Sequence, residues 1–553
     1  MPARLCLVAA AAAASPPARA ELDLRRAEVS RLENGLTVIV LEDHSLPVVS
    51  TQMIYRSGSR DETAGKTGLA HFLEHLAFRA TASFPNGAAT DAVYDAGGEW
   101  HGYTWLDQTS YYSTMPAGGL DLMLRIEADR MARVTIDPAA IAAERGAVIT
   151  EMHSYENDPA SVLFDAVAAA AFQAHPYRNN TVGYESDVAA LTAEDARAFY
   201  AAHYAPSNAV LAIVGDVDRR QARALVRRHF GPLPTRPAPS RVAAVEPLQR
   251  GERRIRLAGA VGRQHFEVAY PAPAASSPDH PAFLILQQML SGGSGVNFRQ
   301  NDWGTPAVAG AALHGAAEDL KSWFIPTADR YLLTITGSVD ANADSAALER
   351  DLERRISRLR SEVPRADQMA AARAAVAGQL VFDVETTEDA AHQLAFFEGI
   401  GAFERLLDLP RQVAAVSGED VRRVAQAYLA PELRTIGWLV PGDPPAQAGL
   451  GVGTLAPAAP RPGAPPRPEA AALPELRRLS GGLAAIVQRS PLSPTASVQV
   501  LLTAPLDGEG VSQDWAGIGT VTRSGPAAAL PTLIADARRA LARRPAASAA
   551  SSD

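Results

Sequence analysis

Cysteine is almost absent from this sequence, because Cys6 is the only one in 553 residues. Disulfide bonds and thiolate metal ligands are therefore excluded from the rest of the chain, and any metal ion must be held by histidine and carboxylate side chains. No segment approaches the roughly 18 uninterrupted apolar residues of a transmembrane helix, so no membrane span is expected. A basic surplus is also missing, since 52 Lys and Arg oppose 61 Asp and Glu for a net charge of -9. Without a basic stripe interleaved with aromatic residues, nucleic acid is not an expected partner.

The first twenty residues have the layout of a secretory signal peptide. A short start ending at Arg4 precedes the apolar stretch 5–14, and an Ala-x-Ala sequence ends at Ala20. This order of regions predicts cleavage after Ala20 and an exported protein, either periplasmic or secreted. A disordered alanine-rich start is the alternative interpretation.

Strand-like and helix-like segments are mixed along the chain without strict alternation. A chain of this length exceeds a single core, so several domains are expected. The mixture favours an α+β fold of repeated two-layer domains, each with a mostly antiparallel sheet packed against helices. Apolar periodicity predicts strands at 36–40, 209–214 and 331–336, and helices at 69–78, 120–131, 141–152, 344–360 and 366–381.

Two helix starts are marked by local sequence. Asp137 followed by Pro138 is typical of an N-cap with proline in the first helical position. Thr192, with Asp195 three residues later, indicates a variant capping box at the start of a helix that runs to Tyr200.

Composition divides the chain beyond the signal into four parts. We expect one domain at 21–235, a second of similar size at 236–445, a linker rich in proline and alanine at 446–473, and an incomplete third unit at 474–553. Arg31-Leu-x-x-Gly-Leu-x-x-Ile-Val40 recurs as Arg478-Leu-x-x-Gly-Leu-x-x-Ile-Val487, a constant offset of 447 residues. Six identities in one register indicate an internal repeat, with two unrelated glycine-turn hairpins as the alternative.

The strongest chemical signal is His71-Phe-Leu-Glu74-His75 within an apolar helical stretch. Histidines four residues apart project from one helix face, so both imidazoles can reach the same cation. Glu74 places a carboxylate beside them without being a necessary ligand. From the composition, chance would produce this H-x-x-E-H spacing roughly 0.03 times in the chain.

A catalytic zinc site needs three protein ligands and one open position. The helix expected after Asp137 carries Glu144 and Glu151, which are seven residues apart and share a face. One of them would be the third ligand, and the other would orient a histidine or the metal. The remaining histidines, such as His175, His203 and His229, follow no such pattern and are expected to be structural or exposed.

The chain at this point resembles the insulinase or pitrilysin family of zinc metallopeptidases. The resemblance implies one zinc ion per chain with His71, His75 and Glu151 as ligands, Glu74 as general base and Glu144 as a supporting acid. Glu151 lies 76 residues after His75, which is the habitual spacing of the family. The matching segments are Gly58-Ser-Arg-Asp-Glu62, 65–75, Phe84-Pro85, Gly97-Gly98, Tyr103-Thr104, Thr109 with Tyr111-Tyr112, 144–151, His175-Pro-Tyr177 and 204–216.

The family likeness also implies how a substrate is bound. Relatives add an extended peptide as a strand at a sheet edge, and the corresponding substrate-binding residues here are Gly98, Glu99, Trp100, His101, Gly102, Tyr103 and Thr104. His101 stands where relatives usually carry asparagine. The implied function is a zinc endopeptidase acting on extended peptides or small unfolded proteins, with 21–235 as the catalytic domain and 236–445 as an inactive homologous domain.

Two departures keep other functions open. Complete family members resemble a clamshell of four domains, and the last quarter supplies an Arg and a Tyr that hold the substrate. No such pair is identified here, so a homodimer or a second homologous chain is expected to complete the chamber. The alternative is a non-catalytic binding or assembly subunit on the same fold, and a weaker one is a zinc storage or sensor protein, which would not need Glu74.

Overall fold

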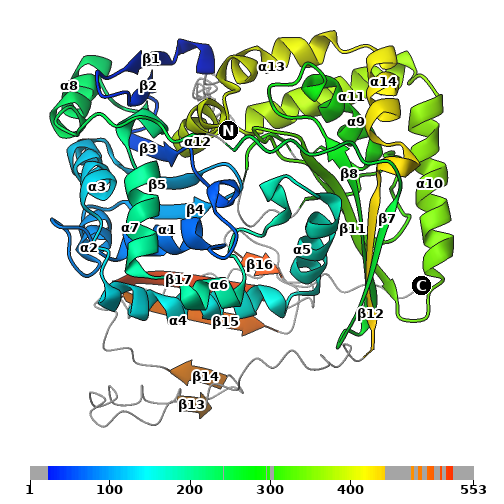
Figure 1. Ribbon diagram of the computed structural model, residues 1–553, viewed down its shortest axis with the longest axis horizontal. Coiled ribbons are helices and arrows are strands. Elements are labelled where there is room, and N and C mark those ends of the chain that lie inside the picture. Colours follow the sequence, from blue (N-terminus) through cyan, green and yellow to red (C-terminus); the bar gives the residue numbers. More distant parts are fainter. Residues whose placement is uncertain are drawn as a thin grey trace, which may run out of the picture. The chain divides into compact units, whose positions relative to one another are not determined.

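The computed structural model describes residues 23–240, 242–293, 295–298 and 304–442, together with the backbone of five strands between 475 and 526. The chain divides into two compact units, Met1–Ala446 and Gln447–Asp553. Two six-stranded sheets form the first unit (Figure 1). The signal peptide predicted from the sequence, with Cys6 in it, and the whole of the 446–473 linker lie outside the described residues.

The first sheet has the strand order β1-β2-β6-β3-β5-β4. Only the pair β2 and β6 is parallel, and the other four neighbouring pairs are antiparallel. The strands are β1 (Glu28–Arg31), β2 (Thr37–Glu42), β3 (Val48–Tyr55), β4 (Glu99–Thr104), β5 (Thr109–Pro116) and β6 (Ala209–Gly215). Strand β4 is therefore an edge strand of this sheet.

The second sheet repeats this topology in the order β7-β12-β8-β11-β10-β9. Again one pair, β7 with β12, is parallel and the others are antiparallel. The strands are β7 (Arg253–Gly259), β8 (Arg263–Ala272), β9 (Thr305–Pro306), β10 (Glu318–Trp323), β11 (Tyr331–Asp340) and β12 (Thr435–Pro441). By position, β7, β12, β8, β11 and β10 correspond to β2, β6, β3, β5 and β4. The predicted α+β class with mostly antiparallel sheets is confirmed.

The helices also begin where the local sequence predicts. The Asp137 side chain accepts a hydrogen bond from Ala140 N at the start of α4, and Thr192 and Asp195 form the predicted capping box at the start of α7. The first half carries α1 (Leu69–Arg79), α2 (Ala88–Asp95), α3 (Leu120–Arg133), α4 (Pro138–Glu156), α5 (Pro159–Ala171), α6 (Glu185–Ala190), α7 (Ala193–His203) and α8 (Arg219–Phe230). The second half carries α9 (His280–Leu290), α10 (Ser345–Ser361), α11 (Ala366–Phe382), α12 (Thr387–Gly399), α13 (Phe403–Ala415) and α14 (Gly418–Tyr428).

Each half lends one helix to the sheet of the other. Helix α12 packs on β3 and β6 of the first sheet, and α5 packs on β8 and β12 of the second. Across the first contact, Ser50 Oγ lies 2.8 Å from Thr387 Oγ1. Across the second, a Cβ added to Gly437 would lie 2.4 Å from a methyl carbon of Val167. This exchange ties the two halves together.

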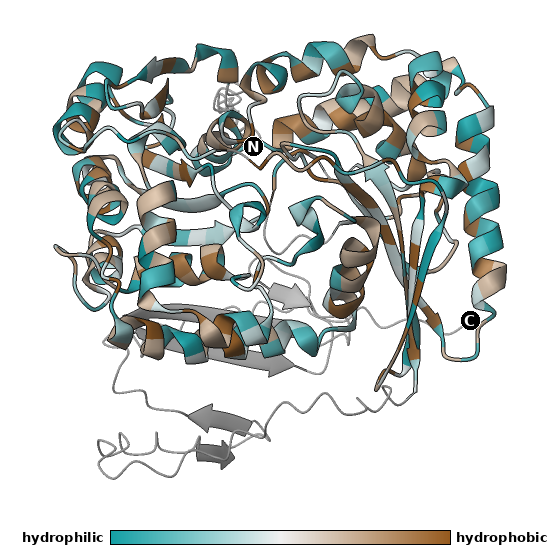
Figure 2. Cartoon of the chain, viewed as in Figure 1, coloured by the Kyte–Doolittle hydropathy of each residue, from teal (hydrophilic) through white to brown (hydrophobic). Residues whose placement is uncertain are grey.

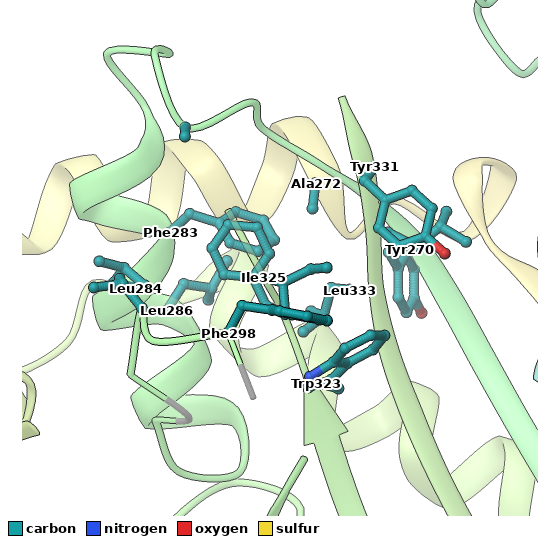
Figure 3. Close-up of a cluster of buried hydrophobic side chains, with 14 of the residues drawn as sticks. Tyr270, Ala272, Phe283, Leu284, Leu286, Phe298, Trp323, Ile325, Tyr331 and Leu333 are labelled. Atoms are coloured by element: carbon teal, nitrogen blue, oxygen red, sulfur yellow. The ribbon is translucent and has the colours of Figure 1, made fainter. Parts of the chain in front are cut away.

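Alternating side chains place two apolar cores on opposite faces of the first sheet. Val49, Met53 and Tyr55 of β3 point into the core that α1 and α3 cover, whereas Ile54 belongs to the larger core shared with the second half. In that larger core Phe283 of α9 is directed toward Ile325 and Leu333 (Figure 3). Outer helices such as α10 are mostly hydrophilic (Figure 2).

In the second unit the structure describes the backbone of five strands. Strand β13 (Glu475–Arg478) pairs with β14 (Ala484–Val487), while β15 (Thr495–Leu502) and β16 (Val511–Gln513) both pair with β17 (Gly519–Pro526). Strands β13 and β15 lie 447 residues after β1 and β3, and the partnering of Glu475 with Val487 repeats that of Glu28 with Val40. The predicted repeat therefore extends to strand pairing, while the domain boundaries stay a prediction. Among the described residues, no helix has the length and apolarity to cross a membrane.

Candidate metal centre

Helix α1 is fixed in place by a partly buried carboxylate at its start. Glu62 accepts hydrogen bonds from Gly68 N at 2.9 Å and from Ala70 N at 2.8 Å, where the helix would otherwise leave backbone donors unpaired. Gly68 takes the left-handed conformation, with φ of 81°, that the chain needs to enter the helix. Burial raises the pKa of Glu62 to about 8.

His71, His75 and Glu151 converge from two packed helices, α1 and α4. One possible ligand atom from each lies within 4.8 Å of the others. Glu151 Oε2 is 3.2 Å from His75 Nε2 and 3.6 Å from His71 Nε2. This is the one group of three or more such side chains found in the described part of the chain. Two imidazoles and one carboxylate are a donor set that suits catalytic zinc, so these residues fit the ion that the sequence predicts.

The electrostatics of the group favour metal-binding protonation states. Burial, followed by the neighbouring His75, lowers the pKa of His71 to about 4, which keeps this imidazole neutral. The hydrogen bond from His75 holds the pKa of Glu151 below its ordinary value. Burial opposes the charged form of His75, yet the surrounding carboxylates, Glu151 first among them, raise its pKa. Metal binding needs a neutral imidazole, so a cation would displace the proton of His75.

Glu74 lies beside the three possible ligands His71, His75 and Glu151 (the ligand group) and is not one of them. Its side chain is buried, and Thr104 Oγ1 donates a hydrogen bond of 2.7 Å to Glu74 Oε2. Burial raises the pKa of Glu74 to about 7. A carboxyl group whose pKa lies near neutrality is suited to accept and return a proton.

Glu144 and Glu151 lie in different places, although residue spacing alone had left open which of the two is the third ligand. Glu144 Oε2 is 3.6 Å from His75 Nδ1, on the side of the ring that faces away from the ligand group, and Glu144 Oε1 accepts a hydrogen bond of 2.8 Å from Arg79. This arrangement orients the His75 ring, the kind of support that metal-binding histidines usually have.

The predicted substrate segment forms the edge strand β4, preceded by Gly98, and β4 pairs only with β5 among the described strands. Trp100 and Thr104 point toward α1, where Trp100 packs on Phe78. Tyr103 points to the other face, and its hydroxyl lies 2.8 Å from His392 Nε2 of α12. A Cβ on Gly102 would lie 2.6 Å from the Phe78 ring, so only glycine fits there.

His101 and Glu99 are exposed on this strand, and the His101 ring centroid is 5.4 Å from that of Tyr112. His175 and His203 are buried, and His229 contacts Asp121 at 2.7 Å. None of these three histidines belongs to the ligand group.

Two residues around the site were missed by the sequence reasoning: Arg79, which supports Glu144, and Tyr155, which contacts Glu151. Thr104 was predicted as a substrate-binding residue, but its hydrogen bond to Glu74 was not. Arg79 and Tyr155 each lie four residues after a site residue on the same helix, a spacing at which side chains meet. That spacing was the available signal, whereas the contact of Thr104 with Glu74 depends on how β4 packs against α1.

The fold and the site together define a protein in which an H-x-x-E-H helix lies beside the edge strand of a mixed sheet. Family models agree with this description. The model for Insulinase (Peptidase family M16) matches residues 37–185, and the model for the Peptidase M16 inactive domain matches residues 190–376. The chain belongs to the M16 insulinase family.

Named relatives cover most of this chain. Mitochondrial-processing peptidase subunit beta of Blastocladiella emersonii is 27% identical over 76% of this chain and 90% of its own length. Zinc protease PqqE of Helicobacter pylori is 26% identical over 76% of this chain and 94% of its own. Cytochrome b-c1 complex subunit 1 of Homo sapiens is 27% identical over 55% of this chain and 64% of its own.

Solved structures show the same fold. A protease from Helicobacter pylori matches with a TM-score of 0.70 and 24% identity, covering 75% of this chain and 99% of that one. The periplasmic protease PqqL from Escherichia coli matches with a TM-score of 0.61 and 16% identity over 87% of this chain but only 57% of its own length. This chain is thus similar to part of a longer protein.

Proposed function

We propose that this protein is a zinc-dependent endopeptidase that hydrolyses extended peptides or small unfolded proteins. One observation carries the proposal: His71, His75 and Glu151 present their donor atoms within 4.8 Å of one another, next to the buried carboxylate of Glu74. Relatives named as zinc proteases support it.

Each residue of the site has a separate proposed role in peptide hydrolysis. A zinc ion held by the three ligands would polarise the substrate carbonyl and acidify water. Glu74 would accept a proton from the attacking water and return it to the leaving amine. Thr104 occupies Glu74 Oε2, which leaves Oε1 for the proton. Glu144, fixed by Arg79, keeps the His75 ring in place.

The edge of β4 is where the peptide is proposed to bind. An added strand gains backbone hydrogen bonds, which recognise extension more than sequence. Thr104 ends this strand and contacts Glu74, so a peptide along β4 passes the proposed base. Export to the periplasm or the medium is part of the same proposal, because the start of the sequence has the layout of a signal peptide.

Two variants and a matched control test the assignment. Glu74→Gln should keep zinc, measured by elemental analysis, and lose hydrolysis of a quenched peptide pool, because it removes the base and no ligand. His75→Ala should lose zinc. His153→Ala changes an exposed histidine on α4 outside the ligand group and should keep both zinc and activity. Full zinc retention in His75→Ala, or parental turnover in Glu74→Gln, would refute the proposal.

A second candidate is a non-catalytic subunit on the same fold. The likeness to a subunit of the cytochrome b-c1 complex favours it. The two candidates differ in one measurement, because a purely structural subunit leaves the peptide pool intact even when its zinc is retained. A zinc storage protein would also leave the peptide pool intact, and its zinc binding would not change in Glu74→Gln.

A further inference from the structure

The two carboxylate oxygens of Glu151 have different surroundings. Oε2 faces the Nε2 atoms of both His71 and His75, at 3.6 and 3.2 Å. Oε1 accepts a hydrogen bond from the Tyr155 hydroxyl at 3.4 Å. Tyr155 lies one turn further along α4, four residues after Glu151, so the two side chains share a helix face. Only Oε2 is turned toward the histidines.

Glu144, the other carboxylate of α4, shows the same division. Its Oε1 accepts a hydrogen bond from Arg79 at 2.8 Å, and its Oε2 is turned toward His75 Nδ1. In both glutamates a donor outside the ligand group holds one oxygen and leaves the other for the histidines. The orientation of each carboxylate is therefore set by a protein donor before any ion binds.

Orientation matters because a carboxylate can bind a metal through one oxygen or through both. A catalytic zinc site uses three protein ligands and keeps a position free for water or substrate. If Glu151 supplied two oxygens together with His71 and His75, four protein donor atoms would surround the ion. The second oxygen of Glu151 would then compete with water and substrate for the free position.

We propose that Tyr155 is a positioning residue that restricts Glu151 to binding zinc through Oε2 alone. The hydroxyl competes for Oε1 and so preserves the position that substrate and water need. This inference rests on the proposed function and adds to it a determinant of coordination number. The hydrogen bond of Tyr155 is with Glu151, and its interaction with Glu74 is electrostatic only, so its effect on the ligand atoms passes through Glu151.

The test is Tyr155→Phe in the full chain, loaded with zinc or with cobalt in its place. Phenylalanine keeps the ring and removes only the hydroxyl. Visible absorption of bound Co²⁺ reports coordination geometry and is severalfold stronger for four than for five ligands. We expect the variant to retain one metal ion, to show the weaker spectrum, and to lose about 10-fold in kcat with KM unchanged. Tyr184→Phe, at an exposed tyrosine, is the matched control and should behave like the parent.

Each outcome decides the inference. A weaker cobalt spectrum in Tyr155→Phe, with an unchanged melting temperature, supports it. A metal-loaded, active parent whose spectrum is unchanged in Tyr155→Phe would overturn this inference and leave the proposed function standing. A parent that binds no metal would overturn both together.

Discussion

Replacing Glu267 by glutamine should stabilise the protein, and the gain should grow as the pH rises. Glu267 lies on β8, opposite Gly437 of β12, under helix α5. It is 1% exposed, and neither of its carboxylate oxygens has a hydrogen-bond partner among the described residues. The charged group that faces it is another carboxylate, Asp165 of α5, and Tyr331 of β11 lies near both. No cation among the described residues is found to offset this pair.

The size of the effect follows from the pKa of the buried group. Burial, and then Asp165, raises the pKa of Glu267 from 4.5 to about 8. The folded chain therefore keeps a proton that the unfolded chain releases above pH 4.5. Stability from this group is fully present below that pH and is lost as the pH rises toward 8. The loss between about pH 5 and about pH 8 amounts to about 3 kcal/mol, because each pKa unit corresponds to about 1.4 kcal/mol.

Denaturant unfolding at several pH values measures this directly. The side chain of the glutamine variant cannot ionise. Its free energy of unfolding should therefore increase relative to that of the parent as the pH rises from about 5 to about 8. Glu362→Gln, at an exposed position after α10, should show no such trend. A constant difference between Glu267→Gln and the parent at all pH values would refute the reasoning.

Three further outcomes are expected. Arg60→Met should lower the free energy of unfolding by about 3 to 5 kcal/mol in thermal and denaturant melts, because Arg60 bridges Asp107 and Asp329 at 2.6 Å each and Asp107 would stay buried without a counter-charge. Gly437→Ala should cost about 1 to 3 kcal/mol in the same melts, because the added methyl group meets Val167. Peptidase activity per chain should rise with protein concentration, because a homodimer is expected to complete the chamber. Full activity from a monomer, with mass followed by light scattering, would contradict that expectation.

Local signals in the sequence predicted much of the fold. The caps at Asp137 and Thr192 depend on side chains bonding to backbone atoms three residues away, so a short stretch of sequence contains all the information needed. The H-x-x-E-H spacing works in the same way, because helix geometry alone puts His71 and His75 on one face. The positions of strands and helices could be predicted because apolar periodicity is also a local property of the sequence.

Contacts between distant segments escaped prediction. The exchange of α5 and α12 between the sheets depends on shape complementarity, such as the space above Gly437, which no periodicity encodes. Residue spacing alone left the choice between Glu144 and Glu151 open, because both project from the same face of α4, and only the family resemblance pointed to Glu151. The position of α1 along that helix brings Glu151 to both histidines and Glu144 to the far side of one ring, which no local pattern encodes.

The two halves share a topology but differ in features that bear on catalysis. Helix α9 takes the place of α1, yet it carries one histidine, His280, which is fully buried at its first turn, and no acidic residue. Strand β10 takes the place of β4, but its outer edge is already paired with β9, where Thr305 partners Ser322. A peptide thus meets a filled edge in the second half, whereas β4 has no second partner among the described strands. Because both a ligand-bearing helix and a vacant edge are needed to cut a bound strand, the first half alone meets the structural requirements of the proposed reaction.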